Sequence, residues 1–321
     1  AEAEYRHEER TKLILVLDNV RARLPLSRAE YDHPQGKTLL QLSEVSGRII
    51  LTRSEIIIPR LDAKLNGVAC RISGKYRGYS THLDNVSFDL HVAATGFPCP
   101  DYTNPPERDY LEAYLPWKLC CFFRDFKPRG KLDLNLMISK PRGLNAPLTL
   151  AGQVRPRGVS AEYYKFPYRL DNLTGSVRLA DGGFELIGLT GFSAGGKAVI
   201  NGTISEPSKF AKIDLAITTS RTPLDPKLFH ALPAPYRAIW KKFDLAGAAD
   251  AQIELHQAYG PDQPWQTRIT AALLDVSGTY QGFKYPLRNM TGVLQFENGV
   301  LELCNVTGRN GAAHVTLNGK V

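Results

Sequence analysis

One motif of about 40 residues is written three times in this chain, and its spacing restricts the fold more than any other feature. The copies begin at Ser46-Gly47, Thr174-Gly175 and Thr291-Gly292, which are 128 and 117 residues apart, and none needs an internal gap. Repeats of this kind stack on their neighbours and build bodies that bind, bridge or scaffold more often than they catalyse.

Apolar and polar residues alternate within the motif. Val177 and Leu179 flank Arg178 in the second copy, and Leu294 and Phe296 repeat the pattern in the third. A period of two residues is typical of strands with one buried and one solvated face. Asn-Gly and Asp-Gly pairs between such runs predict hairpin turns. The predicted fold class is therefore mainly β, an elongated antiparallel sheet built from repeats.

Two helical segments interrupt this pattern at equivalent positions, residues 107–126 and 225–243. The second begins with Asp225 as an N-cap and Pro226 at the first helical position. Internal prolines should divide each segment into a short turn and a longer helix. Alternating residues predict a strand after each segment, Lys131–Ser139 and Ala248–Gln257.

The repeat predicts one continuous architecture rather than independent domains. Residues 1–76 form a partial first unit, residues 77–205 the second and residues 206–321 the third. Both ends read as cuts through something larger, so any membrane anchor is expected outside this sequence.

The net charge of +8 comes from 40 basic and 32 acidic side chains that are scattered along the chain. A solvated surface is the favoured interpretation, and a weak preference for anionic lipid headgroups or nucleic acid is the alternative. No sequence signature of a nucleic-acid-binding fold accompanies the charge, so no nucleic-acid partner is predicted.

Residues with catalytic or metal-binding chemistry lack the spacing that such chemistry needs. The seven histidines and five cysteines show no metal-ligand spacing, and no nucleophile elbow or phosphate-binding loop is present. Glu55, Glu185 and Glu302 recur at one repeat position, which favours solvent-facing residues or cross-strand charge pairs over catalytic carboxylates. The sequence predicts no enzyme, no cofactor and no metal.

Five Asn-X-Ser/Thr sequences are possible glycosylation sites, but three of them, at Asn172, Asn201 and Asn289, coincide with repeat positions interpreted as turns. Turn chemistry is the preferred explanation.

Two aromatic blocks carry a family resemblance. Tyr163-Tyr-Lys-Phe-Pro-Tyr-Arg-Leu-Asp-Asn-Leu-Thr-Gly175 and Tyr280-Gln-Gly-Phe-Lys-Tyr-Pro-Leu-Arg-Asn-Met-Thr-Gly292 resemble the AsmA-like repeat. The endings Val199-Ile-Asn-Gly202 and Thr316-Leu-Asn-Gly319 are similar to it as well. The chain thus resembles a stretch of the AsmA, TamB and YhdP type of bacterial envelope protein from about residue 13 onward, although residues 21–40 depart from the pattern.

The resemblance implies a sheet that curls into an open, taco-like apolar groove. It also implies a periplasmic segment of a parent protein anchored in the inner membrane, which carries phospholipid or another acyl lipid towards the outer membrane. The composition is compatible with this, because a twisted sheet of more than about ten strands tends to curl and two short helical segments are too few to cover its apolar face.

The candidate site is therefore an apolar surface rather than a catalytic group. Its predicted lipid-facing residues are Ile49, Leu51, Ile56, Ile58, Ile72, Val177, Leu179, Phe184, Leu186, Ile200, Ile213, Leu215, Ile217, Leu294, Phe296, Leu301, Leu303 and Leu317. Phe123 and Trp240 are expected to seat the helices on a sheet edge or groove mouth.

Two alternatives remain open. The same residues could form the closed core of a structural scaffold or interaction module of the cell envelope. A repeat-built enzyme is disfavoured, because solenoid coils run about 20–30 residues whereas this unit is about 120.

Overall fold

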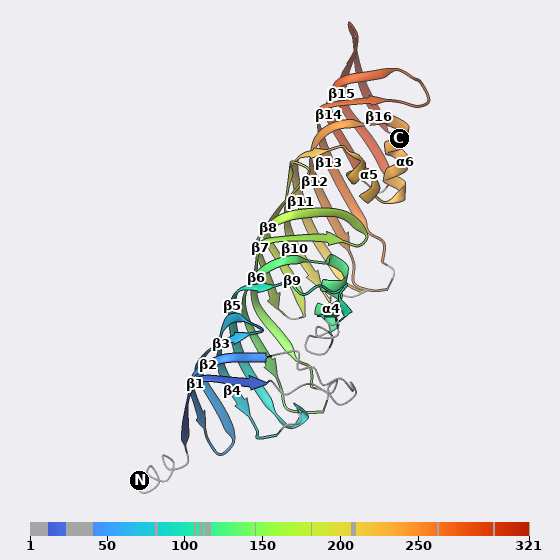
Figure 1. Cartoon of the computed structure of the whole chain (residues 1–321). Coiled ribbons are helices and arrows are strands. Elements are labelled where there is room, and N and C mark those ends of the chain that lie inside the picture. Colours follow the sequence, from blue (N-terminus) through green and yellow to red (C-terminus); the bar gives the residue numbers. More distant parts are fainter. Residues whose placement is uncertain are drawn as a thin grey trace. The chain divides into compact units, whose positions relative to one another are not determined.

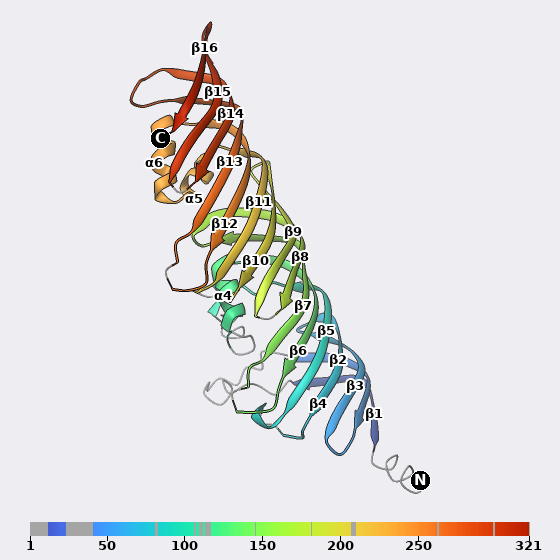
Figure 2. The same cartoon turned by 180° about the vertical axis from the view of Figure 1, so that it is seen from behind.

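The described part of the chain forms one antiparallel sheet of sixteen strands, in which each strand pairs with its neighbours in sequence (Figures 1 and 2). The computed structural model describes residues 12–23, 41–80, 83–105, 107–108, 112, 117–144, 146–180, 182–206, 210–261, 263–297 and 299–320. The strand order runs from β1 to β16 without closing into a barrel. The sequence-based prediction of a mainly β, antiparallel fold is confirmed.

The strands are eight to fifteen residues long, and most are joined by short connections. They are β1 (Leu13–Arg23), β2 (Gln41–Leu51), β3 (Glu55–Leu65), β4 (Val68–Arg77), β5 (Ser87–Pro98), β6 (Arg129–Lys140), β7 (Thr149–Tyr163), β8 (Phe166–Ala180), β9 (Gly183–Ser193), β10 (Gly196–Ser205), β11 (Lys212–Pro223), β12 (Ala246–Gln257), β13 (Gln266–Thr279), β14 (Pro286–Glu297), β15 (Val300–Asn310) and β16 (Ala313–Lys320).

The described parts of the two predicted helical segments contain the short α-helices α4, α5 and α6. In the first, α4 covers Trp117–Phe126, and part of the preceding stretch lies outside the described residues. The second segment holds α5 (Pro226–Ala231) and α6 (Ala234–Phe243), which are separated as the internal prolines predict. The predicted cap is also present, since the Leu228 amide donates to the Asp225 carboxylate over 2.9 Å. A 3₁₀ turn covers Leu83–Asn85.

The chain divides into two compact units, and each is described separately below. The first unit comprises Ala1–Cys120, Lys131–Arg155 and Arg178–Gly182. The second comprises Cys121–Gly130, Pro156–Val177 and Gly183–Val321. The three-part division predicted from the repeat is a different description of the chain and stays a prediction.

β-Bulges occur at equivalent places in the three copies of the motif. Glu44, Asn172 and Asn289 are the repeat-equivalent residues, and each has a positive φ, of 52°, 53° and 49°. Asn172 and Asn289 lie inside strands, so interpreting these sequences as turns was wrong. Asn201 also lies within a strand, where its side-chain oxygen accepts a hydrogen bond from the Gly188 amide over 2.7 Å. The left-handed conformation of a bulge explains Asn172 and Asn289, and the hydrogen bond to the Gly188 amide explains Asn201.

Each unit has its own apolar cluster. In the first, the buried members are Leu42, Val45, Leu61, Ala63, Cys70 and Ala94. In the second, they are Leu273, Val276, Met290 and Val306. Cys70 thus behaves as the small apolar residue that its repeat position predicts.

Candidate functional site

An uninterrupted row of apolar side chains crosses seven strands of the second unit. Each member lies opposite the next in the antiparallel register, so all of them share one face of the sheet. From β9 to β15 the row consists of Leu189, Ile200, Ile217, Ile253, Ile269, Phe296 and Leu301. We call this set of seven residues the apolar row.

The other predicted site residues of the second unit lie beside this row on the same face. Leu294 lies opposite Leu303, two residues from Phe296 and Leu301 along their strands. Leu215 lies two residues from Ile217 and opposite Leu255. The remaining members are Val177, Phe184, Leu186, Ile213 and Leu317, which occupy β8, β9, β11 and β16.

In the first unit the predicted residues also share one face. Ile49, Ile58 and Ile72 pack against the apolar cluster of that unit. Leu51 lies opposite Ile56, and these two are two residues along their strands from Ile49 and Ile58. Leu179 on β8 belongs to the first unit as well.

Most of the predicted site residues retain solvent exposure. Val177, Leu179, Phe184, Ile213 and Leu301 are buried. The other thirteen are half-buried, and none is fully exposed. Side chains in a fully packed core would be buried throughout, so this face keeps accessible apolar surface.

The helices cover part of this face in the second unit. The Phe122 ring of α4 lies 5.1 Å from the Phe184 ring, and the Tyr236 ring of α6 lies 4.7 Å from the Phe296 ring. Ring pairs at these distances are favourable beyond simple area burial. Phe122 and Tyr236 thus contact the sheet, while the expected role of Phe123 and Trp240 stays a prediction.

The attachment of each helix to the sheet is repeated with the same spacing of 117 residues as the sequence motif. Phe126 stacks on Tyr163 at 4.9 Å, and Phe243 packs on Tyr280 at 5.3 Å. A backbone hydrogen bond accompanies each pair, from Tyr164 to the Asp125 carbonyl and from Gln281 to the Lys242 carbonyl, at 2.9 and 2.8 Å. We call each ring pair with its hydrogen bond a helix clamp.

The opposite face of the sheet is polar. In the second unit Thr218, Gln252, Thr270, Gln295, Glu302 and Lys320 lie opposite one another in sequence from β11 to β16. Arg268 bridges Glu254 and Glu297 at 3.2 and 2.7 Å, and its hydrogen bond lowers the pKa of Glu297. The two faces thus have opposite chemistry, as the alternation of the sequence predicts.

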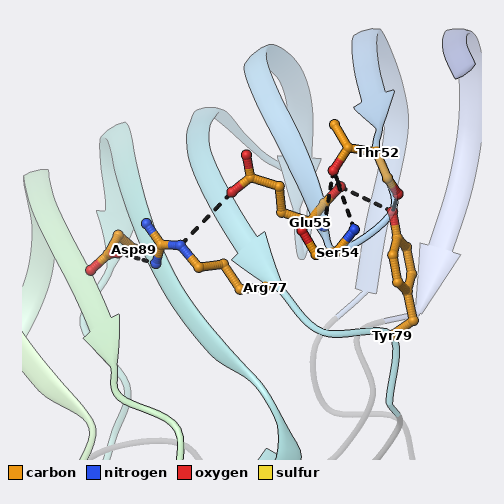
Figure 3. A network of polar contacts seen from close by, with 6 residues as sticks. All are labelled: Thr52, Ser54, Glu55, Arg77, Tyr79 and Asp89. Atoms are coloured by element: carbon orange, nitrogen blue, oxygen red, sulfur yellow. Dashed lines mark hydrogen bonds and ion pairs between the residues drawn. The ribbon is translucent and has the colours of Figure 1, made fainter. Parts of the chain in front are cut away.

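Figure 3 shows an equivalent polar network in the first unit. Arg77 lies between Asp89 and Glu55, at 2.8 and 3.8 Å, and its hydrogen bond lowers the pKa of Asp89. The Thr52 hydroxyl accepts a hydrogen bond from the Glu55 amide over 3.1 Å, while the Tyr79 hydroxyl donates to the Glu55 carbonyl. These contacts order the turn between β2 and β3. The cross-strand charge pairs predicted for Glu55 and Glu302 are present, the latter with Lys320 at 3.3 Å.

The buried Thr219 hydroxyl of the second unit has no hydrogen-bond partner in the described part of the chain. Thr219 lies two residues from Ile217 and opposite Ala251, on the apolar face. Buried polar groups are usually satisfied, so a water or a ligand atom beside Thr219 would complete its bonding. Burial also raises the pKa of the Tyr168 phenol, which a hydrogen bond with Ser193 partly opposes.

Metal and thiol chemistry find little support in the described residues. Among them, no group of three or more His, Cys, Asp or Glu side chains could hold a metal ion. The five cysteines are free thiols, and burial raises the pKa of Cys99 to about 12 and also raises the pKa values of Cys70 and Cys121. A thiol with a raised pKa stays protonated at neutral pH, and the protonated form is a poor nucleophile. No described helix combines the length and apolarity of a membrane span.

Sequence analysis missed several members of the apolar face. Leu189, Ile253 and Ile269 complete the apolar row; Leu189 lies inside the second motif copy, whereas Ile253 and Ile269 lie on strands outside the three copies. The alternation in Ala248–Gln257 was visible and could have located Ile253. Ile269 follows the connection between β12 and β13, whose length makes the pairing register of these two strands unpredictable from sequence.

Comparisons with known proteins give no match: no protein-family model, curated protein or solved structure is significantly similar to this chain. The resemblance to the AsmA-like repeat therefore depends on the quoted residues alone.

Proposed function

We propose that this chain is a non-enzymatic lipid-binding segment that holds phospholipid acyl chains against the apolar face of its sheet. The observation that carries the proposal is the apolar row, which is continuous over seven strands and contains half-buried isoleucines. A long hydrocarbon chain needs an extended apolar surface of this kind. Because the side chains of the row are similar, an acyl chain would bind with similar affinity at each position along it.

The energetics favour an acyl ligand over a small polar one. Removing a 16-carbon chain from water contributes about 0.8 kcal/mol per methylene, or roughly 12 kcal/mol before entropic costs. The unpartnered Thr219 hydroxyl on the same face could donate to an ester oxygen. The proposal that the chain belongs to a bridge-like envelope protein in the periplasm depends on the family resemblance alone.

The test compares two neighbouring carboxylates on β11. Ile217→Asp places a charge in the apolar row, while Thr218→Asp places the same charge on the exposed, polar face. We expect purified wild-type protein and Thr218→Asp to take up a fluorescent phospholipid and to carry co-purified lipid in mass spectrometry. Ile217→Asp should keep its strand content by circular dichroism and lose most of this binding.

Two outcomes would contradict the proposal. If Ile217→Asp unfolds the protein, the apolar face is a closed core and the scaffold alternative is favoured, since an unpaired carboxylate in a packed core costs several kcal/mol. If the wild-type protein binds no lipid, or both variants bind like it, the apolar face does not hold acyl chains.

A further inference from the structure

The topology collects one set of connections of the second unit at a single end of its strands. Because neighbouring strands are antiparallel and follow chain order, the connections β7–β8, β9–β10, β11–β12, β13–β14 and β15–β16 all lie at the same end. The helices α5 and α6 belong to this set (Figure 2). We call it the helix-bearing end, and we call the end with β8–β9, β10–β11, β12–β13 and β14–β15 the opposite end.

Exposed lysines gather at the helix-bearing end. They are Lys165, Lys227, Lys241, Lys242 and Lys284. In the described part of the chain, none of these five ammonium groups forms an ion pair with a carboxylate. Of the acidic residues in these connections, Asp225 caps α5 and Asp244 is exposed at the end of α6.

The opposite end has a different charge. Glu206, Asp214, Glu297 and Glu302 lie there. Among the described residues of this end, Lys212 pairs with Asp214 at 3.5 Å, Lys320 with Glu302 at 3.3 Å and Arg268 with Glu297 at 2.7 Å. The positive charge of the second unit is therefore concentrated at its helix-bearing end, although basic residues are scattered along the sequence.

Exposed aromatic rings accompany the lysines. Phe283 is 70 % exposed and Tyr164 is 50 % exposed, both in turns that belong to a helix clamp. Lys165 lies over the Tyr164 ring at 5.6 Å, and Lys284 directly follows Phe283. Aromatic rings next to lysines are typical of surfaces that insert at the level of lipid headgroups. Tyr259 and Trp265 are exposed at the opposite end too, so it is the charge that distinguishes the two ends.

We propose that the helix-bearing end of the second unit binds the surface of an anionic lipid bilayer. The lysines attract the negative headgroups, and the Phe283 ring enters the boundary between headgroups and acyl chains. A bilayer is favoured over nucleic acid because the Phe283 ring, although it stacks on Tyr285 at 5.9 Å, is 70 % exposed in a turn beside Lys284 and is free to enter the acyl boundary. This surface is separate from the apolar row, so the inference stands independently of the proposed function.

The experiment measures co-sedimentation of the full chain with vesicles of phosphatidylcholine alone or mixed with phosphatidylglycerol. We expect binding to the mixed vesicles only, weakened in 0.5 M salt. Each lysine near the membrane surface raises the partition coefficient about fivefold, so K241Q/K242Q should lower this coefficient on the order of 25-fold. The control K212Q/K320Q removes the same charge from the opposite end and should have little effect. Phe283→Ser should weaken binding, whereas Tyr259→Ser should not.

Three results would overturn this inference: no binding to anionic vesicles, equal losses in the two double variants, or tighter binding of a short oligonucleotide than of vesicles with the same dependence on Lys241 and Lys242. Ile217→Asp, which tests the apolar row, should leave vesicle binding unchanged. Failure of one proposal is thus distinguishable from failure of the other.

Discussion

At the scale of single residues, the repeat is maintained by glycines that let neighbouring strands approach. Gly47, Gly175 and Gly292 have positive φ, and a Cβ atom on each would lie 2.3, 2.5 and 2.6 Å from a carbonyl oxygen of the next strand. No real side chain tolerates such a distance without a shift of the backbone. The glycine that marks the start of each copy in the sequence is therefore required by the close approach of the next strand.

A matched pair of glycines separates this steric effect from backbone strain. Gly202 and Gly319 are repeat-equivalent with φ of 134° and 157°, but a Cβ on Gly202 would lie 2.0 Å from the Asp214 carbonyl, while Gly319 on the edge strand has nothing within 4 Å. We expect Gly202→Ala to lower the free energy of unfolding by about 2–5 kcal/mol and Gly319→Ala by about 1 kcal/mol. Urea denaturation measures the free energy of unfolding of both variants. Equal decreases would show that backbone strain, and not the steric contact at Gly202, determines the cost.

At the scale of elements, the helix clamps show how a short helix is kept on a large sheet. Helices of ten residues are marginal in water by themselves, so tertiary contacts must supply their stability. In both copies these contacts are a ring pair and one backbone hydrogen bond near the helix C-terminus.

Removal of one clamp ring should therefore release one helix and leave the sheet intact. We expect Phe243→Ala to cost about 2–4 kcal/mol locally, because a large partly buried ring and its contact with Tyr280 are lost. Hydrogen exchange of the α6 amides should accelerate, while the amides of β9–β12 keep their protection. The control Phe283→Ala removes an exposed ring of the adjoining turn and should leave α6 exchange unchanged; acceleration throughout the second unit would contradict local release.

The elements also show how far sequence reasoning reaches. Strand alternation predicted the two faces, and the cap at Asp225 with its following proline predicted the start of α5 correctly, because both depend on local chemistry. The bulges at Asn172 and Asn289 were interpreted as turns, since the same residue types favour a left-handed conformation in either setting.

The candidate site was predictable only in part, because strand alternation is local whereas strand pairing and helix packing are not. Alternation places Ile200 and Ile217 on one face, but which residues oppose each other depends on register, and bulges shift the register between strands. The contacts of Phe122 and Tyr236 with the sheet depend on how the helices pack, which no local pattern encodes.

At the scale of the whole molecule, ion pairs on the polar face make stability depend on acid. Hydrogen bonds from Arg77, His256 and Arg268 lower the pKa values of Asp89, Asp214 and Glu297 below those of the unfolded chain. Their stabilising contribution is thus fully present above the unfolded pKa of about 4 and is lost as the pH falls through the folded values.

The melting temperature should accordingly vary little between pH 7 and pH 5 through these groups and fall below about pH 4. Asp89→Asn should lower the melting temperature at neutral pH and reduce its dependence on acid, whereas Asp18→Asn, which removes an exposed carboxylate of β1, supplies a matched charge control. Differential scanning calorimetry across pH tests this, and an acid dependence identical in the wild type and Asp89→Asn would contradict a role for the Arg77–Asp89 pair.

The pairing of strands in chain order affects how such a chain folds during its synthesis. Since every strand pairs with the one made just before it, no part of the sheet has to wait for a distant segment to be synthesised. Each new hairpin can add to an edge that already exists, so growth could proceed in step with the emergence of the polypeptide. A further copy of the repeat would add strands to the last edge of the sheet and leave the pairing of the preceding strands unchanged.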